Sequence, residues 1–268
     1  MKKLVSIALA LVLALGMCLS AGAQEDAAIR VASLKGPTTM GMAKLIKDSE
    51  AGTTQNKYEF TMAGAADEIV PLMVRGELDM ALIPCNLASV LYNNTKGAVE
   101  VLAVNTLGVL YIVENGESVH SMADLKGKTI VASGKGSTPE YALRYLLTEN
   151  GLNPDTDVTI DWKSEHSECV SALATGAATI AMLPQPFVTV AQGQVEGLRV
   201  ALDLTEQWDA LDNGSALLTG VIVARREVVE ANPAAVDAFL KDYAGSVEWV
   251  NANTADAAQL IGSYDIVE

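Results

Sequence analysis

Two short turns in the sequence place a glycine and hydroxyl residues directly before a predicted helix. Their residues are Gly36, Pro37, Thr38 and Thr39 in the first turn, and Gly136, Ser137, Thr138 and Pro139 in the second. Glycine lets a backbone approach a ligand closely, and the free N–H groups of a helix N-terminus favour an anionic or acceptor group. The pattern predicts noncovalent recognition of a small polar or anionic molecule. The alternative is that these hydroxyls only cap their helices.

Other side chains are predicted to face the same site, because ligands bind at the carboxyl ends of strands in open α/β sheets. Asn86 and Gln185 follow predicted strands, and their amides can both donate and accept hydrogen bonds. His166 is a candidate partner for an acidic ligand, and its alternative is an ordinary residue at the start of a helix. The remaining candidates are Cys85, Asn105 and Phe187.

Catalysis has little support in these residues. The stretch from Gly127 to Thr129 ends like a phosphate-binding loop, but Met122 stands where the leading glycine is required. The positions two before and two after Ser137 are not the glycines of a nucleophile elbow. No CxxC cluster indicates a metal site, and no cofactor is implied. We therefore predict a binding protein; the alternative is an enzyme on the same scaffold, with Glu165 and His166 as candidates.

The two turns belong to a longer internal repeat. VASLKGPTTM begins at Val31 and VASGKGSTPE at Val131, and the two share six of ten positions. EIVPLMVRGELDMALIP from Glu68 and ECVSALATGAATIAMLP from Glu168 repeat the displacement of one hundred. Solenoid repeats have periods of about 20–50 residues and at least three copies. The sequence therefore predicts two similar units that each supply donors to a shared cleft.

Short apolar strands alternate with amphipathic helices in both units. This alternation predicts α/β layers around a parallel sheet. The first unit is expected to contain one helix over about Thr39 to Glu50. A strongly periodic helix over Pro233 to Asn251 follows the second unit and is assigned to the first. This assignment requires two chain crossings, near Asn105 to Gly108 and near Asp212 to Gly220.

Several longer phrases carry a resemblance to a known family. They are VASLKGPTTMGMAKL, GELDMALIPCNLASVLYN, SMADLKGKTIVASGKGSTPEYALRYLL, GAATIAMLPQPFV and the text from Val223 to Pro233. The chain resembles the extracytoplasmic solute-binding proteins of ATP-binding cassette importers, in the nitrate, sulfonate and thiamine-pyrimidine group. The resemblance implies the type II periplasmic-binding-protein fold, with two similar Rossmann-like lobes, a hinge and an interdomain cleft. It also implies a small-molecule solute in the cleft and a membrane permease as partner.

With this fold, lobe 1 is expected to comprise residues 27–107 and 216–268, and lobe 2 residues 108–215. Members of the family usually extend past the point where this chain stops. The chain also stops just beyond a helical run without an evident cap. Lobe 1 is therefore expected to be C-terminally truncated.

The first 23 residues are predicted to be a signal peptide. Lys2 and Lys3 precede an apolar run from Leu4 to Gly16, and Ala21-Gly22-Ala23 offers a small-x-small cleavage site. We expect export to the periplasm or to the outer face of the cell membrane. The alternative is a lipid anchor on Cys18, for which Met17 is a poor preceding residue.

The composition limits the partners of the chain. It has 268 residues, of which 50% are hydrophobic, so two domains of ordinary size can each bury a core. Its 33 acidic residues outnumber 18 basic ones, which disfavours nucleic acid and anionic lipid as partners. We expect a monomer that binds a sulfonate, nitrate or aminopyrimidine. A sensory ligand-binding module is the remaining alternative.

Overall fold

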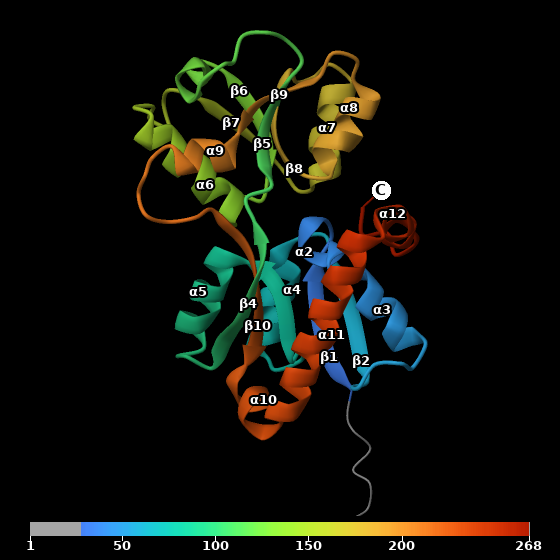
Figure 1. The fold of residues 1–268 in the computed structure, drawn as a ribbon. Helices are drawn as coiled ribbons and strands as arrows, with labels where there is room; N and C mark the ends of the chain where they lie inside the picture. Colours follow the sequence, from blue (N-terminus) through green and yellow to red (C-terminus); the bar gives the residue numbers. More distant parts are fainter. Residues whose placement is uncertain (1–27, 268) are drawn as a thin grey trace, which may run out of the picture.

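The computed structural model describes residues 28–267. The predicted signal peptide and Cys18 lie outside the described residues. Two α/β lobes stand one above the other, and two extended strands run between them (Figure 1). No helix in the described part of the chain is both long enough and apolar enough to span a bilayer.

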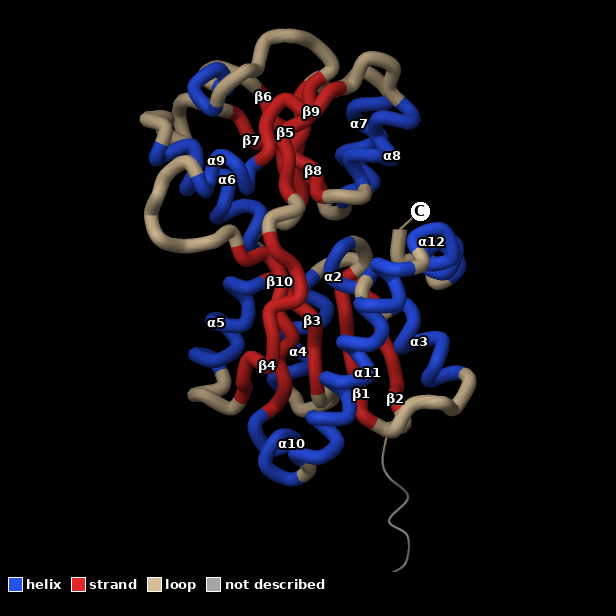
Figure 2. The backbone as a smooth tube through the Cα atoms, viewed as in Figure 1, coloured by secondary structure: helices blue, strands red, loops and turns tan. Residues whose placement is uncertain are grey.

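The sheet of lobe 1 has the strand order β2-β1-β3-β10-β4. Its strands are β1 (Ile29–Leu34), β2 (Tyr58–Ala63), β3 (Met80–Pro84), β4 (Val99–Leu107) and β10 (Leu218–Arg225). Helices pack on both faces (Figure 2): α2 (Pro37–Met40), α3 (Ala43–Glu50), α4 (Ala66–Val74), α5 (Cys85–Asn94), α10 (Arg226–Ala231), α11 (Pro233–Ala252) and α12 (Thr254–Ser263). The periodic helix that follows the second unit therefore packs in lobe 1, as α11 contacts α3.

The sheet of lobe 2 has the matching order β7-β6-β8-β5-β9. Its strands are β5 (Leu110–Glu114), β6 (Thr129–Ser133), β7 (Thr159–Lys163), β8 (Ile180–Pro184) and β9 (Arg199–Asp203). Its helices are η1 (Met122–Leu125), α6 (Thr138–Glu149), α7 (His166–Ala174), α8 (Phe187–Gln194) and α9 (Leu204–Asp209). The sequence repeat is also a structural repeat, because α7 and β8 start and end one hundred residues after α4 and β3.

The prediction of a parallel sheet is wrong for one strand in each lobe. In lobe 1, β10 is antiparallel to both β3 and β4, and in lobe 2, β5 is antiparallel to both β8 and β9. Parallel neighbours need a long crossover connection, usually a helix. The chain instead passes directly from β4 to β5 and from α9 to β10, so each arriving strand enters its sheet from the cleft side in the opposite direction.

The two passages between the sheets lie against each other. The Gly108 N–H donates to the Leu217 carbonyl at 2.8 Å, which joins the outgoing and returning segments. Gly108 has φ +60°, and a Cβ at this position would stand 2.2 Å from the Thr205 hydroxyl oxygen. Glycine is therefore required by both the backbone conformation and the space at this point.

The helix expected over Thr39 to Glu50 is broken into α2 and α3. The hydroxyl of Ser246, on α11, donates to the Gly41 carbonyl at 2.7 Å and accepts from the Leu45 N–H at 3.0 Å. These are the two groups that an unbroken helix would join directly. A Cβ on Gly41 would also stand 3.0 Å from Val247, so the close approach of α11 depends on this glycine.

Replacing Ser246 with alanine is expected to lower the free energy of unfolding by about 1–3 kcal/mol, because the buried Leu45 N–H and the half-buried Gly41 carbonyl would lose their partner. Ser246 is 2% exposed. Urea denaturation followed by circular dichroism measures the effect. Ser263→Ala is the matched control, because the Ser263 hydroxyl donates only to a carbonyl within its own exposed helix end. Equal midpoints for the two variants would contradict the bridging role.

Candidate ligand-binding site

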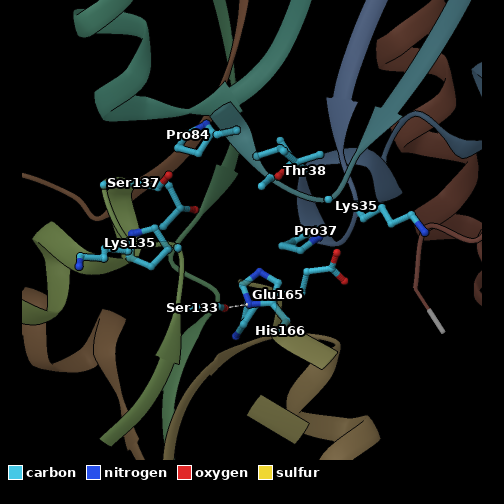
Figure 3. A pocket seen from close by; sticks show the side chains of 18 of the residues that line it. Lys35, Pro37, Thr38, Pro84, Ser133, Lys135, Ser137, Glu165 and His166 are labelled. Atoms are coloured by element: carbon cyan, nitrogen blue, oxygen red, sulfur yellow. Dashed lines mark hydrogen bonds between the residues drawn. The ribbon is translucent and has the colours of Figure 1, made fainter. Parts of the chain in front are cut away.

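A cavity of about 510 Å³ lies between the two lobes. Lobe 1 lines it with the end of β1, with α2 and with the turn before α4, and lobe 2 with the equivalent turns before α6 and α7. Figure 3 shows Pro37 and Thr38 from lobe 1, and Ser137 and His166 from lobe 2, around one space. The N-terminal ends of helices from both lobes thus meet at this cavity.

Neutral hydroxyls of both lobes are available in the cavity wall, Thr38 and Ser137 among them. Thr38 and Ser137 both line the cavity. Within residues 28–267, neither side-chain oxygen has a hydrogen-bond partner, whereas neighbouring Thr39 and Thr138 both do. Hydroxyls in this setting can donate to a ligand oxygen at the N-terminus of a helix.

His166 contributes a third neutral donor or acceptor. Its Nδ1 lies 2.5 Å from the Ser133 hydroxyl oxygen, and both residues line the cavity (Figure 3). Burial lowers the pKa of His166 to about 4, so the ring is neutral near pH 7. Its Nε2 has no hydrogen-bond partner among the described residues and remains available to a ligand.

Three lysines stand at the cavity rim. Lys35 pairs with Asp265 at 2.5 Å and Lys163 with Asp161 at 2.9 Å. Figure 3 shows the side chains of Lys35 and Lys135 extending to opposite sides, away from each other. Asp67 and Glu165 also line the cavity. The rim therefore carries charges of both signs, while hydroxyls and the imidazole supply the polar groups of the wall between them.

The repeat shows which residues distinguish the two walls. At equivalent positions of the two copies, lobe 1 has Ala65 and Ala66, whereas lobe 2 has Glu165 and His166. All four positions line the cavity. At these two positions lobe 2 supplies polar side chains and lobe 1 has small apolar ones, whereas at the next position lobe 1 places the Asp67 carboxylate in the wall.

The structure places five of the sequence-predicted residues in the cavity wall: Pro37, Thr38, Gly136, Ser137 and His166. The other predicted residues are not part of this wall: Gly36, Thr39, Cys85, Asn86, Asn105, Thr138, Gln185 and Phe187. Several of them support the wall or join the lobes.

Thr39 and Phe187 were predicted to face the ligand, but neither side chain lines the cavity. Thr39 is fully buried, and its hydroxyl contacts the Ser33 hydroxyl and the Leu34 carbonyl, both at 2.5 Å. Phe187 is 8% exposed and packs in the core of lobe 2, with its ring centroid 4.9 Å from that of His166. The Thr39 side chain points into lobe 1, where hydroxyl and carbonyl partners hold it. The Phe187 ring packs in the core of lobe 2 and also approaches Gly36 of lobe 1.

Asn86, Gly136 and Thr138 form a contact between the lobes. The Asn86 side-chain amide donates to the Gly136 carbonyl at 2.9 Å and accepts from the Thr138 hydroxyl at 3.1 Å. The Asn86 backbone N–H lies 3.3 Å from the same hydroxyl. The polar groups of these residues are therefore occupied by hydrogen bonds to one another.

The remaining predicted residues also have partners within the protein. The Asn105 amide donates to the Thr38 carbonyl at 3.1 Å. The Gly36 N–H donates to the Ile266 carbonyl at 2.8 Å, and the Gln185 N–H donates to the Val109 carbonyl at 2.9 Å. Cys85 is a half-buried free thiol at the start of α5.

Carboxylates of the chain occupy several backbone N–H groups at the cavity, one of them in the predicted second turn. The Gly136 N–H donates to Glu140 at 2.6 Å. Glu68 and Glu168, at equivalent positions of the repeat, each accept from two backbone N–H groups before α4 and α7. These carboxylates occupy N–H groups that precede the helices, whereas the Thr38 and Ser137 hydroxyls have no side-chain partner among the described residues.

Ser133, Lys135 and Lys163 also line the cavity, although they were not among the site residues predicted from the sequence. Ser133 ends a buried strand and carried no pattern of its own, but the turn it starts was already singled out.

Within the described residues, no group of histidine, cysteine and carboxylate side chains could hold a metal ion. Glu165 and His166 are not hydrogen-bonded to each other in the described structure, so they do not form an acid–base pair.

The chain matches the protein family described as "ABC transporter, phosphonate, periplasmic substrate-binding protein" over residues 43–264. The chain belongs to this family. A curated relative, "Putative binding protein BAB2_1146" of Brucella abortus (strain 2308), is 26% identical over 189 residues. The match covers 70% of this chain and 56% of the relative, so the chain spans about half the length of that protein.

Solved structures share the fold of this chain. The aliphatic sulphonate binding protein SsuA of Escherichia coli superimposes with a TM-score of 0.70 at 19% identity, covering 88% of this chain and 78% of SsuA. The nitrate-binding protein NrtA of Synechocystis PCC 6803 gives a TM-score of 0.65 at 16% identity, covering 88% and 66%. At these identities the likeness concerns the fold alone.

Replacing Asn86 with alanine is expected to favour a more open arrangement of the lobes. The variant loses side-chain hydrogen bonds across the cleft, each worth about 0.5–1.5 kcal/mol, so the open-to-closed ratio should rise about tenfold. Small-angle X-ray scattering measures the change as a larger radius of gyration. Asn93→Ala is the control, because Asn93 bonds only to Ser89 within α5. An unchanged radius for Asn86→Ala would exclude a closing role for this contact.

Proposed function

We propose that the protein is the substrate-binding component of an ATP-binding cassette importer, and that it binds a small aliphatic oxyanion between its lobes. The observation that carries this proposal is the cavity of about 510 Å³ walled by equivalent turns of both lobes. A ligand that contacts both walls stabilises the closed arrangement, because it binds that arrangement more tightly than the open one.

The ligand class follows from the chemistry of the wall. Thr38, Ser137 and His166 offer neutral polar groups near helix N-termini, a setting that suits oxyanions. Aliphatic side chains, including Leu34, Val70 and Leu87, supply an apolar surface beside them. This combination favours an oxyanion with a short hydrocarbon part, such as an alkyl sulfonate or phosphonate, over bare nitrate.

An aminopyrimidine is less well supported. A flat heteroaromatic ligand is usually held by stacking on aromatic side chains. No Phe, Tyr or Trp is among the described residues that line the cavity. Phe187 is buried in lobe 2, and Trp208 packs on Tyr145 with ring centroids 4.9 Å apart.

The family description supports a location outside the cytoplasm and a membrane permease as partner. The protein acts as a monomer, binds no nucleic acid and catalyses no reaction in this proposal. The acidic surface, with a formal net charge of −15, accords with the exclusion of nucleic acid. The bound, closed form is the species that the permease would receive.

A thermal-shift screen of the chain from Gln24 onward tests the proposal. The compounds are butane-1-sulfonate, butylphosphonate, taurine, nitrate and an aminopyrimidine. A ligand at one hundred times its dissociation constant adds about 2.7 kcal/mol, which corresponds to roughly 5–10 °C for a chain of this size. We expect a shift of that order for a sulfonate or phosphonate. A folded sample that responds to none of the compounds, or only to the aminopyrimidine, would contradict the proposal.

A further inference from the structure

A buried serine at the end of the first strand of each copy has different partners in the two lobes. Ser33 and Ser133 are 0% and 2% exposed, and they are separated by the repeat distance of one hundred. The Ser33 hydroxyl contacts the Thr39 hydroxyl at 2.5 Å, within lobe 1. The Ser133 hydroxyl contacts His166 Nδ1, also at 2.5 Å.

Two sequence differences between the copies explain the change of partner. Position 139 is proline where the first copy has Thr39, so lobe 2 has no hydroxyl there to pair with the serine. Position 166 is histidine where the first copy has Ala66, so a new polar group is within reach. A buried hydroxyl without a partner is unfavourable, which makes the two differences interdependent.

The surroundings of Ser133 determine which atom holds the proton between the two side chains. Ser133 also interacts with the thiol of Cys169, which itself donates to the Glu165 carbonyl at 3.7 Å. Sulfur is a weaker acceptor than an imidazole nitrogen. The best acceptor for the Ser133 proton is therefore His166 Nδ1. A neutral imidazole that accepts at Nδ1 carries its own proton on Nε2.

Phe187 supports the other side of the imidazole. The two rings have centroids 4.9 Å apart at an interplanar angle of 43°. The first copy has Leu87 at the equivalent position. The buried Phe187 ring also approaches Gly36 of lobe 1, where a Cβ would stand 3.4 Å from it. The imidazole is thus held between a hydroxyl and an aromatic ring that touches the opposite lobe.

We infer that Ser133 is a positioning residue that holds His166 as an Nε2–H donor to the ligand, with Phe187 fixing the plane of the ring. The inference rests on the proposed function, because it concerns the same cavity. It assigns recognition of one ligand oxygen to lobe 2, through a side chain that has no counterpart in lobe 1. A ligand whose head group offers only donors at this point is excluded by the same geometry.

Nitrogen-15 NMR of the ligand-free protein tests the tautomer directly. The chain contains two histidines, His120 and His166, so each imidazole signal can be assigned by a single substitution. We expect Nδ1 of His166 to be unprotonated and Nε2 protonated in the wild type. In Ser133→Ala the two tautomers should mix, whereas Ser33→Ala, the matched loss of a buried hydroxyl in lobe 1, should leave the His166 signals unchanged.

Calorimetric titration with butane-1-sulfonate and butylphosphonate tests the consequence for binding. Ser133→Ala should raise the dissociation constant about fivefold to tenfold, the change expected when one well-oriented hydrogen bond to the ligand is lost. Ser133→Thr keeps the hydroxyl and should stay within about twofold of the wild type, as should Ser33→Ala.

The outcomes separate this inference from the proposed function. Wild-type binding with equal affinity in Ser133→Ala and Ser33→Ala would overturn the positioning role and leave the proposed function intact. A wild-type tautomer with the proton on Nδ1 would also overturn it. Failure of the wild type to bind any compound would contradict the proposed function, whereas the NMR comparison would still decide the role of Ser133.

Discussion

Replacing Thr38 and Ser137 together with alanine is expected to weaken binding of an alkyl sulfonate or phosphonate by about 10- to 100-fold. The two hydroxyls line the cavity from opposite lobes, and neither has a partner among the described residues. A hydrogen bond to a charged ligand group contributes about 1.5–3 kcal/mol, and some of this is recovered by water in the variant. Each single variant should show roughly half of the free-energy change.

Calorimetry measures the binding, and the unfolding midpoint measures the effect on stability. The midpoint should change little, because neither hydroxyl supports another part of the described protein. A double variant of exposed hydroxyls elsewhere, Thr148→Ala with Ser263→Ala, is the control, since those side chains bond only within their own helix or its end. Equal affinity of the wild type and the Thr38/Ser137 variant would exclude recognition by these hydroxyls.

Replacing Asp79 with alanine is expected to lower the free energy of unfolding by about 3 kcal/mol without changing ligand affinity directly. The carboxylate accepts from the Arg30 backbone and guanidinium at 2.6–3.0 Å and from Arg225 at 2.9 Å. Asp79 is 9% exposed, and Arg225 Nε already lacks a partner. Without the carboxylate, the Arg225 charge would remain partly buried with one partner fewer.

The Asp79 carboxylate also makes the free energy of unfolding depend on pH, in a direction that follows from its pKa. Burial alone would raise the pKa of Asp79, but hydrogen bonds from Arg30 and Arg225 outweigh burial and lower it below its ordinary value of 3.8. A lowered pKa in the folded state means that the stabilisation is complete above pH 3.8 and is lost as the pH falls through the folded-state value. Asp79→Asn keeps the side-chain volume but has no titrating carboxylate. In this variant, the part of the free energy of unfolding that falls in acid should be lost. Parallel stability profiles of wild type and Asp79→Asn below pH 4 would contradict the account.

The repeat made much of the fold predictable from the sequence. The displacement of one hundred residues predicted two lobes with equivalent elements. The assignment of α11 to lobe 1 followed from its position after the second copy, in which it had no equivalent. The antiparallel strands β5 and β10 were not anticipated, because their direction depends on where the chain crosses and not on local periodicity. The break between α2 and α3 depends on Ser246, about two hundred residues away, which no local pattern could indicate.

The cavity was only partly predictable for a similar reason. Local pattern located the turns that hold Thr38 and Ser137, since glycine and hydroxyl residues before a helix are visible in sequence. It could not separate a residue that faces the cavity from one that faces the core one position later, as for Thr38 and Thr39. Local pattern also could not indicate that Asn86 and Thr138 hydrogen-bond to each other across the cleft, because that contact depends on the positions of both lobes.

The most direct test of ligand binding between the lobes is an amide proton–nitrogen NMR titration of the protein with butane-1-sulfonate. The account predicts that the largest shift changes occur in both lobes, at the turns around Thr38 and Ala65 and at those around Ser137 and His166. Shift changes confined to one lobe, or to surfaces away from these turns, would contradict binding in the cavity.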